Sequence, residues 1–474
     1  MTEPSLPQRL IPKLNQTVTR LGFGGYRASD MATHGAALQY ALDQGINLID
    51  TGANFENGRS EQLVGEILAS GSVDRKDVTL VTKAGYLTKQ DIDRLGDGDD
   101  HVHIQGNSFH GISPRILADQ LEQSLARLQT SYVDIFMINA PERMLASARP
   151  SGDLYKQLGD SFQYLETLVR QGTIKGYGIC SNTMGSSHSA MDHLSLSKIL
   201  AACDHLKDNH FCAVEAPFNL YEQHLGQDLA WLDQLDAHGV FWLSNRPLNA
   251  ITPQGQIRGL YNPTMASASD MDDLRVAFEK VATLEIDMLS ELPEDDEASP
   301  FVWGQILSEN LQRLGQHHFA TQHYLKSQVL PKLQKDLADF REMYTTQPAY
   351  MEWTDVYESA MHHLITCLVN YSYMDTLKKN NELDRILGAL IPWPTSSCHS
   401  PLTVKALEVC LANQDVGAIV TGMRQIPYVD DAVLALKESQ TLQKMVKVDG
   451  FDSVKKRPLC PITNARNYQL STVC

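Results

Sequence analysis

The chain of 474 residues lacks several patterns that would place it in other classes of protein. Its eight cysteines form no CxxC pair, so reduced thiols are expected rather than a disulfide framework. No HExxH motif or comparable ligand spacing is present, although histidines gather in one polar loop and in one helical stretch. We therefore expect no metal site. These histidines are His101, His103 and His110 in the loop, and His317, His318 and His323 in the helical stretch.

A basic segment and a long apolar segment are also missing. The formal net charge is −17, from 57 acidic and 40 basic residues, and no basic run offsets it. This excess of acid disfavours nucleic acid and anionic membrane surfaces as partners. No apolar stretch reaches the length of a membrane span, and the N-terminus lacks the apolar core of a signal peptide. The expected location is the cytoplasm.

Short apolar runs alternate with amphipathic stretches through the first half of the chain. This alternation is typical of βα units on a parallel sheet. Seven strands are predicted, at Val18–Phe23, Ile46–Asp50, Val78–Lys83, Val133–Asn139, Ile174–Cys180, Ala213–Pro217 and Val240–Ser244. Six helices follow the first six strands, at Gly35–Gln44, Ser60–Ala69, Ser113–Leu128, Leu158–Gln171, Leu194–Leu206 and Asp228–His238.

The seventh strand is not followed by its helix at once. The alternation resumes with a helix at Pro401–Asn413, a strand at Gly417–Thr421 and a helix at Val429–Lys437. The sequence thus predicts an α/β fold, a (β/α)8 TIM barrel with a large, mostly helical insertion between strand 7 and helix 7. The predicted domains are 1–250 with strands 1–7, 251–400 as the insertion, 401–440 as barrel completion, and 441–474 as a C-terminal tail.

The insertion is predicted to be helical because apolar residues recur three and four positions apart in it. The expected helices are Asp270–Leu292, Glu309–Met343 and Trp353–Leu387. Active sites of such barrels lie at the C-terminal ends of the strands. An insertion after strand seven is therefore expected on the active-site face, as a lid, a substrate wall or a partner surface.

The segment 48–61, LIDTGANFENGRSE, leads from a strand end through a loop into a helix. It resembles the aldo-keto reductase signature, in which a tyrosine after the aspartate donates a proton to the substrate carbonyl. Asp50 matches the aspartate, and Phe55 occupies the tyrosine position. Phenylalanine has no proton to donate, and general acid catalysis is worth roughly 10²–10⁴-fold. The resemblance therefore implies a reductase with altered or weak activity.

Other strand ends extend the resemblance. Lys83 matches the family's lysine, which pairs with the aspartate, and a lysine facing a barrel interior needs such a partner. Asn139 stands where the family has a histidine that orients the substrate carbonyl, and its amide can donate a hydrogen bond but cannot titrate. Tyr26 is interpreted as pocket lining, with proton donation by Tyr26 or Glu56 as the alternative.

The cofactor side of the resemblance begins with GYGICSNT (176–183), which is similar to the family segment whose serine and asparagine hold the nicotinamide carboxamide. Glu215 stands where relatives usually have a glutamine that contacts the same amide. Residues 422–431 resemble the cofactor-phosphate segment, in which helix-start N–H groups and Arg424 would form an anion site. The implied cofactor is NADP(H), with NAD(H) as the alternative. The implied binding residues are Gly25, Tyr26, Ser181, Asn182, Glu215, Arg246, Pro247, Leu248, Gly422, Met423, Arg424 and Asp431.

The segment FWLSNRPLNA (241–250) is similar to one branch of this family that carries a long helical insertion after strand seven. The leading hypothesis is hydride transfer from NADP(H) to a small carbonyl substrate. The alternative is a non-catalytic nucleotide-binding scaffold or sensor whose protein partner binds residues 251–400. Lyase or isomerase chemistry with Lys83 as Schiff-base nucleophile is disfavoured, because pairing with Asp50 would raise the lysine pKa.

Overall fold

The computed structural model describes residues 6–96, 98–146, 151–252, 257–261, 271–292, 301–316, 318–391 and 393–448. These residues form two compact units. One lies within Met1–Ala250 and continues from Leu390 onward, and the other lies within Ile251–Ala389. Each unit has a hydrophobic core of its own.

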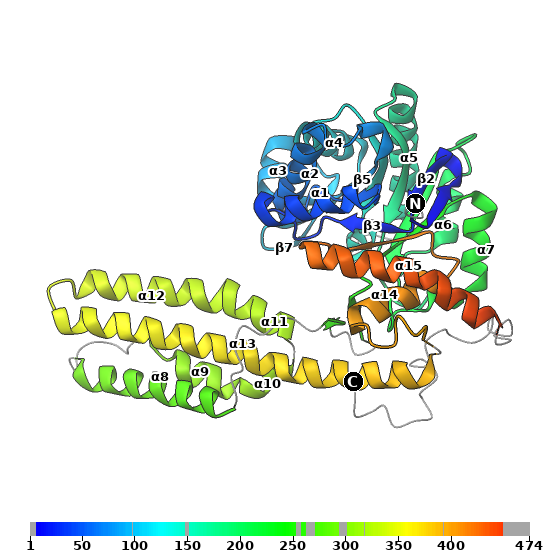
Figure 1. Cartoon of the computed structure of the whole chain (residues 1–474). Helices are drawn as coiled ribbons and strands as arrows, with labels where there is room; N and C mark the ends of the chain where they lie inside the picture. Colours follow the sequence, from blue (N-terminus) through cyan, green and yellow to red (C-terminus); the bar gives the residue numbers. More distant parts are fainter. Residues whose placement is uncertain are drawn as a thin grey trace. The chain divides into compact units, whose positions relative to one another are not determined.

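The first unit is a closed barrel of eight parallel strands (Figure 1). Their order around the barrel follows the sequence, and the last strand pairs with the first through Ile419 beside Leu21. Seven of the eight predicted barrel strands are confirmed as single strands, the first only in its second half, and the (β/α)8 fold is confirmed. The strands are β3 (Leu21–Gly24), β4 (Leu48–Asp50), β5 (Thr79–Ala84), β9 (Val133–Asn139), β10 (Ile174–Cys180), β11 (Phe211–Pro217), β12 (Phe241–Asn245) and β15 (Ala418–Thr421).

The barrel helices are also where the sequence predicts them. Local signals set their ends: Asp228 caps α7 by accepting from the Trp231 N–H, and Gly239 ends that helix with a φ of 60°. The helices are α1 (Ala36–Asp43), α2 (Arg59–Ala69), α4 (Pro114–Leu128), α5 (Ser151–Gln171), α6 (Leu196–Cys203), α7 (Leu229–His238), α14 (Leu402–Ala412) and α15 (Ile426–Val448). Shorter helical turns are η1 (Pro12–Leu14), η2 (Met31–Gly35), η3 (Phe55–Gly58), η4 (Arg75–Asp77), η5 (Pro141–Ala146) and η6 (Leu225–Gln227).

Alternation along the strands divides the barrel into an inner and an outer core. Leu48 and Val81 belong to the inner cluster, whereas their neighbours Ile49 and Leu80 pack in the cluster shared with the helices. Successive strand side chains point to opposite faces, so Asp50, two positions after Leu48, also faces the interior. The barrel geometry itself therefore forces a carboxylate into a buried space.

The first predicted strand is divided in two. Gln16–Thr19 forms β2, which pairs with β1 (Gln8–Ile11) in an antiparallel hairpin, and the barrel strand begins only at Leu21. Arg20 lies at the break, and its guanidinium donates to the carbonyls of Leu411, Asn413 and Val416 before β15. These long-range contacts reorient the backbone at a point where the local sequence reads as one continuous strand.

The loop predicted to hold three histidines is a small antiparallel sheet instead. It consists of β6 (Tyr86–Thr88), β8 (Ser108–Gly111) and β7 (His101–Gln105), with α3 (Lys89–Leu95) between the first two in sequence. Val102 is buried in the barrel unit's core, while the flanking His101 and His103 are more exposed. Polar residues at these flanking positions masked the alternation, so the sequence reading as a loop was wrong.

The second unit is a helical bundle, in which α8, α12 and α13 lie side by side in Figure 1. The stretch 309–343, predicted as one helix, is broken, partly because Pro331 at the start of α12 has no N–H to continue the hydrogen-bond pattern. Two short strands, β13 (Asn249–Ile251) and β14 (Ile257–Gly259), pair before the helices begin. The helical elements are α8 (Met271–Glu291), α9 (Trp303–Glu309), α10 (Leu311–Gln316), α11 (His318–Tyr324), η7 (Leu325–Val329), α12 (Leu330–Met343) and α13 (Pro348–Leu390).

The C-terminal helix is longer than predicted. The expected helix ended at Lys437 and the tail began after residue 440, whereas α15 continues to Val448. Residues 449–474, most of the predicted C-terminal tail, lie outside the described residues. Within the described ranges, no helix is long and apolar enough to cross a membrane.

Candidate active site

Polar side chains gather at the C-terminal ends of the barrel strands. Asp50 ends β4, Asn139 ends β9 and Asn245 ends β12, while Lys83 lies one residue and Glu215 two residues before the ends of β5 and β11. Parallel strands bring these ends to one side of the barrel. The structure therefore collects residues that are far apart in sequence into one region.

A buried ion cluster occupies the interior at this end. The Lys83 ammonium pairs with Asp50 Oδ1, lies 3.1 Å from Glu215 Oε2 and donates to the Thr51 carbonyl at 3.0 Å. Asp50, Lys83 and Glu215 are only 3%, 1% and 3% exposed. The contacts with Asp50 and with the Thr51 carbonyl are hydrogen bonds, whereas Glu215 Oε2 is attracted by charge and has no hydrogen-bond partner among the described residues. The predicted pairing of Lys83 with Asp50 is present, and Glu215 joins it.

The cluster holds the lysine in its charged form. Burial alone would lower the pKa of Lys83, but the carboxylates of Asp50 and Glu215 outweigh this effect and raise it above the ordinary lysine value. Burial and the charge of Glu215 raise the pKa of Asp50 to about 8, although Lys83 acts in the opposite direction. A protonated lysine has no lone pair to attack a carbonyl, which argues against Schiff-base chemistry at Lys83.

Phe55 lies over this cluster. Its ring centroid is 5.1 Å from Lys83 Nζ, and its ring meets Tyr26 edge to face at a centroid distance of 5.4 Å. The phenyl ring offers its π face to the cation and has no hydroxyl to donate. Tyr26 is 57% exposed, and its role as pocket lining stays a prediction.

Asn139 is held by two different contacts. Its side-chain amide donates to Asn54 Oδ1 at 3.2 Å, and its backbone carbonyl lies 2.8 Å from the Nε2 of His110. His110 is fully buried, and burial lowers its pKa to about 4, so it is a neutral structural group at physiological pH. No local pattern in the sequence indicates that a histidine of the small antiparallel sheet would support Asn139.

The loop after β10 positions the two residues expected to hold the nicotinamide. Ser181 is buried and its backbone N–H donates to the Glu215 carbonyl at 2.9 Å, whereas Asn182 is exposed. Glu142, which sequence reasoning missed, accepts from the Asn182 N–H at 3.0 Å. Glu142 is 5% exposed, and burial raises its pKa to about 7. Its position directly after β9, in Ala-Pro-Glu, was the available signal.

The strand-seven segment is fixed by polar contacts. Arg246 has a φ of 54°, and its guanidinium pairs with Glu222 at 2.6 Å. Pro247 is buried and Leu248 packs against the barrel core. Asn245 donates to Glu215 Oε1 at 2.9 Å. Within the described part of the chain, Asn245 Oδ1 and Arg246 Nε are buried without a hydrogen-bond partner.

The segment after β15, residues 422–431, differs in part from the predicted binding site for a cofactor phosphate. Gly422 is exposed with open space around its Cα, Met423 is buried, and Arg424 is half-buried. Burial and the charge of Arg424 lower the pKa of His34, so these two side chains share a region. Asp431 accepts from Thr403 Oγ1 at 3.5 Å between α14 and α15, which gives it a role in helix packing.

Gly25 lies against the start of the site. Its N–H donates to the Asp50 carbonyl at 2.7 Å. A Cβ at this position would lie 2.5 Å from Ser60 Oγ, closer than side chains approach one another. Glycine is therefore required here by close packing against the loop that follows Asp50.

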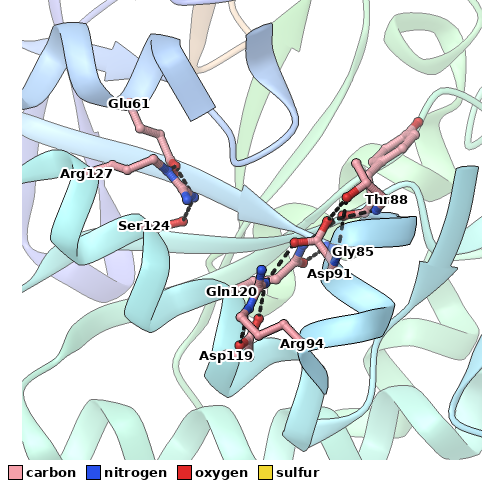
Figure 2. A network of polar contacts seen from close by, with 10 residues as sticks. Glu61, Gly85, Thr88, Asp91, Arg94, Asp119, Gln120, Ser124 and Arg127 are labelled. Carbon is pink, nitrogen blue, oxygen red and sulfur yellow. Dashed lines mark hydrogen bonds and ion pairs between the residues drawn. The ribbon is translucent and has the colours of Figure 1, made fainter. Parts of the chain in front are cut away.

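The strand that carries Lys83 is anchored from outside the barrel. Glu61 of α2 accepts from Thr82 Oγ1 at 2.5 Å and from Arg127 Nε at 2.7 Å, and the latter contact is visible in Figure 2. Figure 2 also shows Gln120 accepting from the Gly85 N–H just after β5. Glu61 is fully buried, so its contacts fix α2 and α4 against β5 and thereby the position of Lys83.

Comparison with known proteins finds similarity to one family over part of the chain. Residues 20–227 match the model of the aldo/keto reductase family. The chain is 22% identical over 211 residues to an uncharacterized oxidoreductase, YqkF, of Bacillus subtilis (44% of this chain, 54% of the relative). It is 30% identical over 162 residues to the methylglyoxal reductase DkgA of Yersinia pestis (34% of this chain, 44% of the relative). The chain thus spans about half the length of these relatives.

A solved structure, the holo form of aldo-keto reductase AKR11C1 from Bacillus halodurans, is 17% identical with a TM-score of 0.49, and the alignment covers 93% of this chain and 96% of that one. The similarity to the aldo/keto reductase family model covers residues 20–227, which is less than half of the chain. Enzymes of this family are generally NAD(P)-dependent oxidoreductases. In the described ranges, no group of three or more His, Cys, Asp or Glu side chains is arranged to hold a metal ion.

Proposed function

We propose that the protein is an oxidoreductase that binds NADP(H), with NAD(H) as the alternative, and acts on a small carbonyl compound with altered or weak activity. The observation that carries this proposal is the buried Asp50, Lys83 and Glu215 cluster at the C-terminal end of the barrel. Buried charge of this kind costs folding free energy, and paired groups with shifted pKa values concentrate at functional sites. The similarity to the aldo/keto reductase family over residues 20–227 supports the choice of reaction.

The residues near β10 to β12 fit a nicotinamide amide. A carboxamide has both N–H donors and a carbonyl acceptor. Asn245 Oδ1 is a buried acceptor without a partner among the described residues, and exposed Asn182 offers both kinds of group beside Ser181. Glu215 Oε1 accepts from Asn245, while Glu215 Oε2 lies near Lys83 but has no hydrogen-bond partner among the described residues, so Asn245 and Glu215 each keep one acceptor for the amide. Arg424 is the candidate contact for a cofactor phosphate. The nicotinamide, when bound, supplies the hydride.

The protein's own groups would orient the carbonyl and stabilise charge on its oxygen. Asn139 uses one amide N–H on Asn54 and keeps the second available for a substrate oxygen. Lys83 supplies a fixed positive charge beneath Phe55, and preorganised charge of this kind stabilises a developing oxyanion. Tyr26 and Phe55 would form an apolar wall that favours a compact carbonyl substrate.

The test is a titration of the purified protein with NADPH and with NADH, followed by nicotinamide fluorescence. We expect saturable binding of the cofactor. Arg424→Ala should weaken the affinity for NADPH by about tenfold, which corresponds to a loss of roughly 1.4 kcal/mol of binding free energy for one charge-assisted contact. The matched control is Arg275→Ala on α8, an exposed arginine of the helical unit, which should leave both affinities unchanged. Absence of binding to either cofactor would contradict the proposal.

A second candidate is a non-catalytic nucleotide-binding scaffold with a protein partner on residues 251–400. The replacement of a tyrosine by Phe55 favours it, since the site then has no phenol hydroxyl at that position. The helical unit also exposes Val276, Ile286 and Leu289 of α8, at 53%, 65% and 51%. This candidate predicts that Ile286→Glu with Leu289→Glu abolishes retention of a cellular partner and leaves cofactor affinity intact. Retention of the same partners by both proteins would argue against it.

A further inference from the structure

The ion cluster joins opposite sides of the barrel. The strand order places β4 and β11 four steps apart in either direction around the eight strands, so Asp50 and Glu215 approach from opposite walls. Lys83, on β5, lies between them and contacts both carboxyl groups. Asn245 holds the other oxygen of Glu215 at 2.9 Å. The cluster is therefore assembled from side chains on both sides of the barrel, at the end where the strands finish.

The charges in this cluster do not balance. Two carboxylates and one ammonium sum to a net charge of −1, and all three side chains are buried. The surrounding groups do not compensate, because Asn245 is neutral and Cys180 stays a thiol, its pKa raised by burial and by Glu215. Glu142, which is also close to Cys180, is a further acid. Two carboxyl groups that share a buried site retain one proton between them, as like charges disfavour ionisation of both.

We propose that Glu215 converts the buried Lys83 and Asp50 pair into a three-membered cluster that stores one exchangeable proton on its two carboxyl groups. This proton can serve as the acid in place of the hydroxyl that Phe55 lacks, a role that rests on the proposed reductase function. When the carbonyl oxygen takes the proton, the carboxyl O–H bond breaks and an O–H bond forms on the product. The cluster then carries one more negative charge until solvent returns a proton.

Glu215 acts through the protonation state of the cluster, which separates this role from a merely structural one. The conservative variant Glu215→Gln keeps the shape and the contact with Asn245 but removes one carboxyl group. Lys83 and Asp50 then form a neutral pair that needs no added proton. A packing role would be preserved in this variant, whereas proton storage would be lost.

The experiment is infrared spectroscopy of the full-length protein without cofactor, near neutral pH, in H2O and D2O. We expect the wild type to show the carbonyl stretch of one protonated carboxyl group that is absent from Glu215→Gln. The band should shift in D2O and disappear as the pH rises past about 8, the pKa of Asp50. If Glu215→Gln does not fold, Asp50→Asn leaves Lys83 with Glu215 alone and should remove the same band.

The matched control is Glu142→Gln, which removes a different buried carboxyl group with a pKa of about 7 and should leave the cluster band in place. A wild-type minus Glu215→Gln spectrum that shows only an ionised carboxylate would overturn the proposal. Because the measurement uses no cofactor, a negative result here is distinct from failure of nicotinamide binding. In the cofactor-loaded protein, loss of turnover in Glu215→Gln with unchanged cofactor affinity supports proton supply, and unchanged turnover contradicts it.

Discussion

The two units of the protein both bury a glutamate, and they satisfy it by different means. Glu285 in the helical unit is 6% exposed, and its Oε1 accepts from the Tyr357 hydroxyl at 2.6 Å and the Gly304 N–H at 2.9 Å. Glu215 in the barrel is 3% exposed and contacts the ammonium of Lys83 together with the amide of Asn245. One acid is satisfied by neutral donors and the other by a shared cation.

This difference separates structural from chemical use of a buried acid. Burial raises the pKa of Glu285, while its neutral donors oppose the shift, and its contacts join α8, α9 and α13. Neutral hydrogen bonds satisfy the acid without bringing a second ionic group into the helical core. The barrel cluster concentrates three ionisable groups at the strand ends. A buried acidic side chain alone is thus a weak indication of function. Whether its partners are neutral or ionised distinguishes a structural role from a chemical one.

The largest effect should come from removing the shared cation. Lys83→Met leaves Asp50 and Glu215 facing each other without a positive charge, and such uncompensated burial costs about 3–5 kcal/mol. We expect this loss in the free energy of unfolding of the barrel, measured by urea denaturation near neutral pH. The loss should shrink at acid pH because both carboxyl groups can then protonate.

Lys175→Met is the matched control for this prediction. Lys175 pairs with Asp134 at 2.6 Å, but its side chain is 41% exposed and Asp134 keeps Arg75 as a partner. Its loss should therefore cost less than that of Lys83. Equal losses in the free energy of unfolding for the two substitutions would show that the buried carboxyl groups do not need Lys83 as a compensating charge.

A pH series tests the same contrast without removing the cation. The folded-state pKa of Asp50, about 8, lies above its unfolded value of roughly 4, so the folded protein retains a proton that the unfolded chain releases. This contribution to stability should be present at low pH and be lost as the pH rises towards about 8. Glu215→Gln removes the main charge that raises the pKa and should flatten the slope in this window. Parallel curves for the two proteins in urea denaturation would contradict the account.

The helical unit should respond more weakly. Tyr357→Phe removes the hydroxyl that donates to Glu285 Oε1, which keeps the Gly304 N–H, and a hydrogen bond to a charged group contributes about 1.5–3 kcal/mol. We expect a lower midpoint for unfolding of the helical unit with little change in cofactor affinity. Tyr350→Phe, whose hydroxyl contacts the exposed Glu291 carbonyl at 3.1 Å, should have a smaller effect. A larger loss in the control variant would contradict the assigned role of Tyr357.

Much of the barrel could be predicted because its signals are local. Each strand is a short apolar run and each helix has its own periodicity, so the elements were found in order, with Asp50 and Lys83 at their strand ends. The split of the first strand at Arg20 depends on carbonyls about 390 residues away in sequence, and no local pattern reports it.

Long-range pairing also explains what sequence reasoning missed in the site. The resemblance places Glu215 on the cofactor amide, and no local pattern reports its contact with Lys83, because β5 and β11 are not neighbours in the barrel. The contacts of Asn139 with Asn54 and His110 likewise join separate loops. A polar residue at the end of a predicted strand can be expected to lie in the site. Which side chains it contacts there depends on how the strands are arranged around the barrel.

The most direct test of the account is a single-turnover reduction of a small aldehyde by the NADPH-loaded wild type and by Phe55→Tyr, followed by loss of nicotinamide absorbance. Slow turnover is expected in the wild type. The restored hydroxyl should raise the rate towards the lower end of the roughly 10²–10⁴-fold range for general acid catalysis, because the cluster already supplies a proton. Saturable NADPH binding with no turnover in either protein would contradict a reductase site at this end of the barrel.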